Sequence, residues 1–308
     1  MNGAFCMKLG FIGLGRMGSN MVLHLLEGGH EVVVYNRSPE PAIALQKRGA
    51  GRAESPAELC AKLGKGKVVW LMVSAGKPVD EVISSLLPHL SRGDILIDGG
   101  NSNYLDSVRR HAQLKGKGIG FLDVGTSGGL EGARNGACLT IGGEPALFRK
   151  LEPLFRSLAI KNGYLYAGRS GAGHYVKTVH NGMEYVMLQA LGEGFETLEK
   201  SPYKPDLEKV AYVWSHGSVV RSWLLELAGR AFGKDAHLRK IEGVVGGGET
   251  GRWAIAQARR AGARVPAMEL ALRERGRSAR KPSFSGKVIA AVRNEFGGHQ
   301  TVGAKKKK

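Results

Sequence analysis

Four polar side chains in residues 171–196 have the types and the spacing of a catalytic site. Lys177, His180, Asn181 and Glu184 stand at positions i, i+3, i+4 and i+7. If the segment is helical they share one stripe, because residues three and four apart are neighbours on a helix. An amine, an imidazole, an amide and a carboxylate are costly to bury without partners. The stripe could therefore surround a polar ligand, or it could be the solvated face of a surface helix.

A glycine-rich segment lies between a predicted strand at residues 7–12 and a predicted helix. A second buried strand, EVVVY, comes next at residues 31–35, so the glycines sit inside a βαβ unit, the context of a dinucleotide site. Gly13 allows the tight turn, Gly15 lets a pyrophosphate approach the backbone, and Gly18 lets helix and strand pack closely. The helix N-terminus supplies free N–H donors. The cofactor contacts expected in this loop are Gly13, Leu14, Gly15, Arg16, Met17 and Gly18.

The residues directly after the second strand bear on the identity of the cofactor. An NAD site usually carries an acidic residue there to hold the ribose 2′-hydroxyl, but this chain has Asn36-Arg37-Ser38. Arg37 can meet a 2′-phosphate, or it can be a solvated loop residue. We therefore expect NADP, with NAD also possible. Loops after strand ends complete the expected cofactor contacts, which are Asn36, Arg37, Ser38, Val73, Ser74, Ala75 and Asn101.

Strand and helix patterns alternate up to about residue 167, and only helical patterns come after it. Further strands are expected at residues 68–73, 94–98, 119–124, 137–141 and 164–166. Later helices are expected at residues 207–214, 219–231, 251–261, 266–275 and 286–295. The fold class is therefore α/β, with a Rossmann-type dinucleotide-binding domain at residues 1–167 and an all-helical C-terminal domain at residues 168–308. We expect a ligand cleft between the domains, with Lys177 at its floor.

The charge of the chain is unusual for its otherwise ordinary composition. Among 308 residues, 45 Lys and Arg against 27 Asp and Glu give a net charge of +18, much of it late in the chain and in the tail Lys305–Lys308. The excess could serve a nucleic acid, an anionic substrate or solubility. No aromatic residues interleave the basic clusters, so no nucleic-acid partner is expected.

Other classes of protein are disfavoured by what the sequence lacks. No apolar run could span a bilayer, and residues 1–6 lack the features of a secretory signal. Cys6, Cys60 and Cys138 have neither disulfide nor metal-ligand spacing. We expect a cytoplasmic protein that uses no metal and does not bind membranes.

Six segments together identify a family. They are GLGRMGSNM (13–21), DGGNSNY (98–104), DVGTSGGLEGARNG (123–136), GAGHYVKTVHNGMEY (171–185), GETGRW (248–253) and RNEFGGH (293–299). In these segments the chain resembles the short form of decarboxylating 6-phosphogluconate dehydrogenase, in the β-hydroxyacid dehydrogenase superfamily. The resemblance covers residues 7–299. The Lys-x-x-His-Asn-x-x-Glu pattern separates this branch from simpler hydroxyacid enzymes. The long form has a duplicated helical domain, and this chain lacks its second half.

The resemblance implies the chemistry: oxidation and decarboxylation of 6-phosphogluconate to ribulose 5-phosphate and carbon dioxide, in the pentose phosphate pathway. Lys177 would remove the proton of the C3 hydroxyl as hydride leaves C3 for the nicotinamide, and would then assist loss of the carboxylate. Glu184 would protonate C1 of the enediol. No metal is needed if the lysine polarises the ketone.

The resemblance also implies the substrate contacts. Those to the carboxylate and hydroxyls would be Asn101, Ser127, Gly128, Gly129, His180 and Asn181. Those to the phosphate would be Tyr185, Thr250, Arg275 and Arg293, with His299 completing the site. In the family, the segment with Arg293 and His299 reaches into the neighbouring subunit's cleft, which implies a homodimer or homotetramer. Gly248 replaces a lysine that helps bind phosphate in the long form, and the clustered arginines could compensate.

Two alternative functions are open at this point. The chain could be another β-hydroxyacid dehydrogenase that acts on a small unphosphorylated acid, and formation of ribulose 5-phosphate and carbon dioxide would separate the two. It could instead be a non-catalytic basic protein that binds nucleic acid, which the net charge favours. The presence of Lys177, Asn181 and Glu184 together argues against that second alternative.

Overall fold

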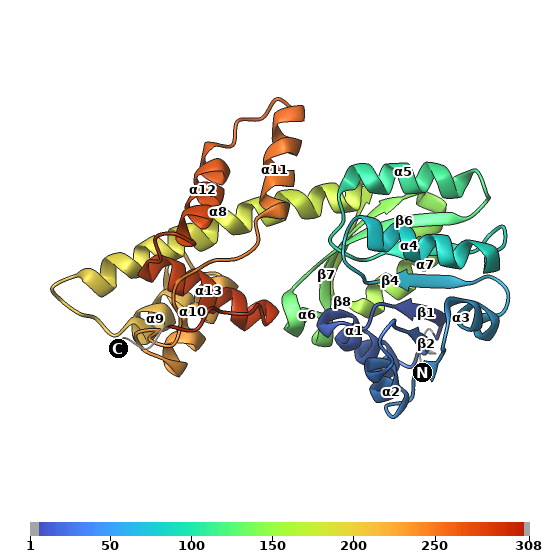
Figure 1. The fold of residues 1–308 in the computed structure, drawn as a ribbon, viewed down its shortest axis with the longest axis horizontal. Coiled ribbons are helices and arrows are strands. Elements are labelled where there is room, and N and C mark those ends of the chain that lie inside the picture. The colour runs from blue at the N-terminus through green and yellow to red at the C-terminus, as the bar shows by residue number, and fades with distance from the viewer. Residues whose placement is uncertain (1–5, 305–308) are drawn as a thin grey trace. The chain divides into compact units, whose positions relative to one another are not determined.

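The computed structural model describes residues 6–304, and the chain divides into two compact units, residues 1–177 and 178–308 (Figure 1). The division falls inside the long helix α8 (Ala172–Lys200). The boundary expected from the sequence, between residues 167 and 168, comes just before this helix. The tail Lys305–Lys308 lies outside the described residues.

The first unit is built on an eight-stranded sheet with the order β3-β2-β1-β4-β5-β6-β7-β8. Neighbouring strands are parallel except for β6 and β7, which are antiparallel. The strands are β1 (Lys8–Ile12), β2 (Glu31–Tyr35), β3 (Gly51–Arg52), β4 (Val68–Leu71), β5 (Ile95–Asp98), β6 (Gly120–Ser127), β7 (Ala137–Gly143) and β8 (Ala159–Gly168). The order 3-2-1-4-5-6 is that of a Rossmann fold, which confirms the predicted fold class.

The central strands are buried on both faces, which explains their unbroken apolar sequences. Phe11 and Trp70 lie on one face of the sheet and stack with their ring centroids 6.2 Å apart. Val69 and Phe121 lie on the other face. Helices cover both faces (Figure 1). They are α1 (Arg16–Glu27), α2 (Glu40–Gln46), α3 (Pro56–Leu63), α4 (Lys77–Leu86), the 3₁₀ helix η1 (Leu87–His89), α5 (Tyr104–Lys115), α6 (Gly129–Asn135) and α7 (Pro145–Leu158).

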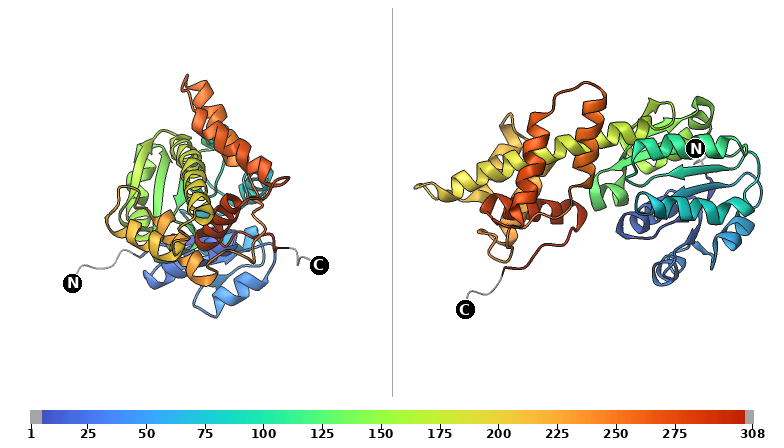
Figure 2. Two further views of the ribbon diagram at one scale, coloured as in Figure 1. Left: turned by 90° about the vertical axis from the view of Figure 1, so that its left-hand side faces the viewer. Right: turned by 45° about the horizontal axis from the view of Figure 1, so that its top comes forward.

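The second unit is helical, as predicted. Its helices after α8 are α9 (Leu207–Gly217), α10 (Trp223–Lys234), α11 (Glu249–Arg260), α12 (Pro266–Ser278) and α13 (Phe284–Gly297). Figure 2 shows α11 and α12 as a neighbouring pair. The core of the unit includes Leu188 and Phe195 from α8, Phe232 from α10 and Val292 from α13. None of the helices within residues 6–304 is long and apolar enough to cross a membrane.

Several predicted boundaries were wrong, and the start of α10 has a local reason. Helix α10 begins at Trp223 rather than at residue 219, because the Ser222 side chain accepts a hydrogen bond from the Leu225 amide and caps the helix. Val219 and Val220 therefore lie outside it and are exposed. Strands β6 and β8 are longer than predicted, β4 is shorter, and the two-residue strand β3 was not predicted.

Candidate active site

The glycine loop between β1 and α1 has the backbone that a dinucleotide site needs. Gly13 has φ +99°, and a Cβ there would lie 2.3 Å from the Met72 carbonyl oxygen. A Cβ at Gly18 would lie 2.0 Å from the Gly13 carbonyl oxygen, so only glycine lets α1 pack this closely. A Cβ at Gly15 would meet no atom of residues 6–304 within 4 Å, which leaves this backbone open to a ligand. The steric roles of Gly13 and Gly18 are those predicted from their spacing.

The N-terminus of α1 faces the same loop. Gly15 is its N-cap residue, no side chain caps it, and the first turn carries no acidic residue, so the terminal N–H groups suit an anion. Arg16 is exposed at this end, whereas Met17 packs against the apolar core.

Asn36 ties the end of β2 to the glycine loop. Its Oδ1 accepts a hydrogen bond of 2.9 Å from the Leu14 amide, and its Nδ2 donates one of 2.9 Å to the Ser38 carbonyl oxygen. Because both groups of the amide are used, the side chain of Asn36 fixes the loop geometry. The contact of Asn36 with a cofactor stays a prediction, and the structure adds this supporting role.

A cavity of about 180 Å³ lies beside Asn36, where β2 and β3 end. Arg37 lines it, and so does Arg52, which sequence reasoning missed. The Arg52 guanidinium lies 2.6 Å from a carboxylate oxygen of Glu54, a third charged residue that lines the cavity. Two guanidinium groups therefore line one cavity at the end of β2.

The later loops meet at the same edge of the sheet, because β1, β4, β5 and β6 are parallel neighbours. A Cβ at Gly100 would lie 2.9 Å from the Val73 carbonyl oxygen, and the Thr126 hydroxyl donates to the Gly99 carbonyl oxygen at 3.1 Å. The residues that this edge gathers are Val73, Ser74, Ala75, Asn101, Ser127, Gly128 and Gly129. Gly128 and Gly129 both have positive φ, so the chain turns sharply into α6 there.

A buried ion-pair network supports the loop after β5. Arg110, which is buried, donates to Asp98 at 3.2 Å and to Asp80 at 2.8 Å. Asp98 in turn accepts from the Gly100 amide at 3.2 Å and from the Ser102 hydroxyl at 2.8 Å. Burial alone would raise the pKa of Asp80, but Arg110 and Arg109 outweigh it and lower that pKa below its usual value.

The first turn of α8 packs directly on the sheet. The Asp123 carboxylate in β6 accepts hydrogen bonds from the Gly171 amide at 2.6 Å and the His174 amide at 3.0 Å. A Cβ at Gly173 would lie 2.4 Å from the Asp123 carbonyl oxygen, and one at Gly125 would lie 2.4 Å from the Cβ of Lys177. These contacts place the Lys177 side chain next to Gly125, close to the carboxyl end of β6.

His174 links α8 to the loop after β5, a role that sequence reasoning missed. Its Nδ1 lies 2.7 Å from the Ser107 hydroxyl, and its Nε2 lies 3.1 Å from the Gly100 carbonyl oxygen. The signal was present in the segment GAGHYVK, where His174 stands one turn before Lys177. A buried imidazole at this place orients the Gly100 loop relative to the helix that carries the lysine.

The predicted helix that carries the polar stripe is confirmed, since Lys177, His180, Asn181 and Glu184 all lie in α8. In the second unit, His180 Nδ1 lies 3.4 Å from Asn181 Oδ1 and 4.0 Å from a carboxylate oxygen of Glu184. Asn181 is buried, Glu184 is half-buried and His180 is exposed. The three side chains thus form one polar group along the helix.

Four residues predicted to hold a phosphate lie together in the second unit. The Arg275 guanidinium stacks 3.6 Å from the centroid of the Tyr185 ring, and the Tyr185 hydroxyl lies 3.2 Å from the Thr250 hydroxyl. Burial and, to a lesser extent, the charge of Arg293 lower the pKa of Arg275, whereas Tyr185 and Glu184 oppose them, and together they bring it to about 10. Burial also lowers the pKa of Arg293. Because two buried guanidinium groups repel each other, an anion bound beside them would be stabilised.

His299 and Arg293 lie at the end of α13. The His299 ring packs edge-on against Phe296 with the centroids 5.7 Å apart, and its carbonyl oxygen accepts from Asn294 Nδ2 at 2.9 Å. Within its own chain, Arg293 is close enough to Tyr185 and Glu184 for their charges to act on its pKa. Exchange of this segment between subunits stays a prediction.

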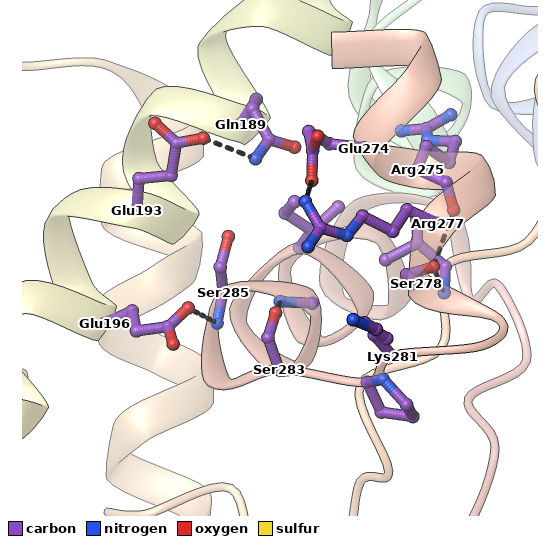
Figure 3. Close-up of a pocket in the computed structure, with 14 residues that line it drawn as sticks. Gln189, Glu193, Glu196, Glu274, Arg275, Arg277, Ser278, Lys281, Ser283 and Ser285 are labelled. Atoms are coloured by element: carbon purple, nitrogen blue, oxygen red, sulfur yellow. Dashed lines mark hydrogen bonds and ion pairs between the residues drawn. The ribbon is translucent and has the colours of Figure 1, made fainter. Parts of the chain in front are cut away.

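A larger cavity of about 310 Å³ lies in the second unit, between α8, α12 and the start of α13 (Figure 3). Its polar residues pair with one another: Glu193 accepts from Gln189 at 2.7 Å, and Glu196 accepts from the Ser285 amide at 3.0 Å (Figure 3). Of the predicted substrate residues, Arg275 alone lines this cavity. In residues 6–304, no group of three or more His, Cys, Asp or Glu residues could hold a metal ion.

Comparison with known proteins identifies the family. Residues 8–168 match the family model of the NAD binding domain of 6-phosphogluconate dehydrogenase, and residues 173–307 match that of its C-terminal domain. The chain belongs to the 6-phosphogluconate dehydrogenase family. It is therefore an oxidoreductase with a domain for a nicotinamide dinucleotide.

Individual family members agree with this assignment. The chain is 47% identical to YqeC of Bacillus subtilis, a protein named as a 6-phosphogluconate dehydrogenase. The match covers 96% of this chain and 99% of that protein. It is 44% identical to the NAD(+)-dependent, decarboxylating 6-phosphogluconate dehydrogenase of Haloferax volcanii, over 96% of this chain and 98% of that enzyme.

A solved structure in the family belongs to a longer protein. The Plasmodium falciparum 6-phosphogluconate dehydrogenase, solved in apo form and with NADP+ or 6-phosphogluconate, superposes with a TM-score of 0.81 at 33% identity. The match covers 89% of this chain but 62% of that chain.

Proposed function

We propose that this protein oxidises and decarboxylates 6-phosphogluconate to ribulose 5-phosphate and carbon dioxide, with NADP as the preferred oxidant and NAD as a second one. The observation that carries the proposal is the placement of Lys177 beside Gly125, at the carboxyl end of the sheet that holds the glycine loop. Helix α8 also carries Glu184 two turns later, so one element supplies a base and an acid.

The first unit fits a dinucleotide. The open backbone at Gly15 and the uncapped N-terminus of α1 suit the pyrophosphate, and the cavity beside Asn36 suits the adenosine ribose. The loops at Val73–Ala75 and Asn101 lie further along the same edge and would contact the nicotinamide half. When bound, the cofactor accepts the hydride that leaves C3 of the substrate.

Lys177 would act first, as the general base for the C3 hydroxyl. Its neutral amine takes the hydroxyl proton while the hydride leaves C3, which gives a 3-keto acid and an ammonium group. The ammonium then donates to the ketone oxygen as the bond between C1 and C2 breaks, so that the electron pair of that bond forms an enediol and carbon dioxide departs.

Glu184 would act last. Its carboxylic acid donates a proton to the substrate carbon that lost carbon dioxide, which becomes C1 of the product. The neutral Lys177 amine takes back the proton of the neighbouring enediol hydroxyl, so that this carbon becomes the ketone of ribulose 5-phosphate. Asn101, Ser127–Gly129, His180 and Asn181 would hold the carboxylate and hydroxyls. The pair Arg275 and Arg293, with Tyr185 and Thr250, would hold the phosphate, since a guanidinium fork matches phosphate oxygens.

We further propose that the protein works in the cytoplasm as a homodimer or homotetramer. Free thiols at Cys6, Cys60 and Cys138 suit a reducing compartment. Exposed apolar residues along α8 suit contact with a second copy of the chain.

A steady-state assay with product analysis tests the proposal. The purified protein should reduce NADP with 6-phosphogluconate and release one carbon dioxide and one ribulose 5-phosphate per NADPH, with little activity on 3-hydroxyisobutyrate. NADP reduction with the small acid but not with 6-phosphogluconate would contradict it. So would binding of nucleic acid without turnover of either substrate.

A further inference from the structure

The cavity at the end of β2 is lined by two guanidinium groups, one more than the sequence revealed. Its lining includes Arg37 from the loop after β2 and Arg52 from β3, which pairs with β2 through the register Val34 to Arg52. The cavity adjoins the glycine loop, because Asn36 lines the cavity and also accepts from the Leu14 amide. A dinucleotide on the glycine loop would thus bring its adenosine ribose to these two arginines.

Arg52 is held in a defined place by its neighbours. Its guanidinium lies 2.6 Å from the Glu54 carboxylate, and its carbonyl oxygen accepts from Lys62 Nζ at 2.5 Å. The Glu54 amide donates to Glu58 at 2.7 Å, and Glu58 pairs with Lys62 at 2.8 Å. The Arg52 side chain is only 24% exposed, compared with 65% for Glu54.

We propose that Arg52 is a specificity-determining residue that binds the ribose 2′-phosphate of NADP together with Arg37. A guanidinium has five N–H donors in a planar fork, so Arg52 can keep its bond to Glu54 and still present donors to a phosphate. The proposal rests on the proposed function for the nature of the cofactor and names a residue that selects its phosphorylated form.

The affinity of the protein for cofactor fragments tests the role of Arg52 without any catalytic turnover. Calorimetric titration of the full chain would use adenosine 2′,5′-bisphosphate and AMP, which differ only in the 2′-phosphate. Arg52→Ala should weaken binding of the bisphosphate about tenfold or more, because hydrogen bonds to a charged group are lost. The dissociation constant of AMP should change less than about twofold, which is less than the loss of a hydrogen bond would cause. The ratio of kcat/KM for NADP to that for NAD should fall by a similar factor.

Arg48→Ala provides a matched control, since Arg48 is an exposed arginine of the same unit that does not line the cavity. It should leave both affinities unchanged. Arg52→Lys keeps the positive charge but loses the planar guanidinium, so this variant should retain part of the preference for the bisphosphate. It replaces Arg52→Ala in the test if that variant does not fold. Equal losses for both ligands, or no loss for the bisphosphate, would overturn the inference. Because this readout needs no turnover, failure of the enzyme assay would not affect it.

Discussion

Two neighbouring guanidinium groups in the second unit, Arg275 and Arg293, belong to the proposed phosphate site. Arg275 stacks on Tyr185, while Arg293 donates to the Gly246 carbonyl oxygen at 2.9 Å. In the sequence, each of these arginines stands among several others that look equivalent. The structure distinguishes them by burial, because Arg273 and Arg277 on the same helix as Arg275 are exposed.

The first prediction concerns Arg293. Arg293→Ala should raise KM for 6-phosphogluconate at least tenfold and change KM for gluconate much less, because only the former carries the phosphate that the guanidinium binds. Steady-state kinetics with both substrates measures this. Arg273→Ala is the control and should change neither KM. Equal increases for the two substrates would remove Arg293 from phosphate binding.

Residue types predicted part of the site, and the reason for each gap is physical. The glycine spacing identified Gly13 and Gly18 because their roles are steric and local. Arg52 was not found because it lies in a two-residue strand, too short to show a hydrophobic period. His174 was missed because its function depends on Ser107 and Gly100, which are distant in sequence and meet it only in the folded chain.

At the level of elements, α8 contains a pair of glycines in contrasting surroundings. A Cβ at Gly192 would lie 2.5 Å from the Ser285 hydroxyl and 2.9 Å from the Ser285 carbonyl oxygen, so α13 packs closely there. A Cβ at Gly194, one half-turn away, would meet no atom of the described chain within 4 Å. The two positions belong to the same helix and differ only in what they face.

The second prediction uses this pair. Gly194→Ala should stabilise the protein by about 0.5–1 kcal/mol, because alanine restricts the unfolded chain and favours the helix. Gly192→Ala should destabilise it by about 1–3 kcal/mol, since α13 must move to make room. Urea denaturation measures both. Similar changes at the two positions would mean that α13 does not pack on α8 as described.

The Asp80 carboxylate joins α4 to α5 through Arg110 and Arg109. Its pKa in the folded protein lies below its usual value, so the contribution to stability is complete above the unfolded-state pKa of about 3.9. That contribution is lost as the pH falls through the lower, folded-state value.

The third prediction concerns the pH dependence of the stability that Asp80 contributes. Asp80→Asn should lower the free energy of unfolding at pH 7, and the gap from the unmodified protein should narrow as the pH drops below about 4. Denaturation across a pH series tests it. Glu81→Gln, which removes an exposed carboxylate from the same helix, should have little effect. If the difference in the free energy of unfolding between Asp80→Asn and the unmodified protein stayed constant with pH, the ion pair would not be the cause of that difference.

Elements with a strong period were the ones that the sequence predicted well. Strands β1 and β2 agree because their apolar residues follow one another almost without interruption. The extension of β8 to Ala159–Gly168 was missed because several of its residues are exposed and polar, as in IKNG at residues 160–163. The start of α10 was set by one cap at Ser222 rather than by apolar spacing.

At the scale of the whole molecule, the proposed oligomer needs a contact surface, and α8 carries an exposed apolar stripe. Val176, Val179, Met183 and Met187 recur at helical spacing and are 38%, 40%, 55% and 42% exposed. A run of exposed apolar residues on one helix face is typical of a protein interface. A second copy of the chain is the occupant that the family resemblance implies.

The fourth prediction is that this stripe holds the oligomer together. The double substitution Met183→Glu and Met187→Glu should reduce the mass in solution to that of one chain, because buried carboxylates are costly at an interface. Light scattering after size-exclusion chromatography measures the mass. Leu105→Glu, at an exposed apolar residue of α5, should leave the mass unchanged. An unchanged oligomer in the double variant would place the interface elsewhere.

The central claim is that Lys177 is the base of a decarboxylating dehydrogenase, and Lys177→Met tests it most directly. Turnover of 6-phosphogluconate should fall by about 10²- to 10⁴-fold, the usual contribution of general base catalysis. Binding of adenosine 2′,5′-bisphosphate should stay unchanged, as should all activity in Lys150→Met, which removes an exposed lysine of α7. Turnover within a few-fold of the unmodified enzyme would contradict the account.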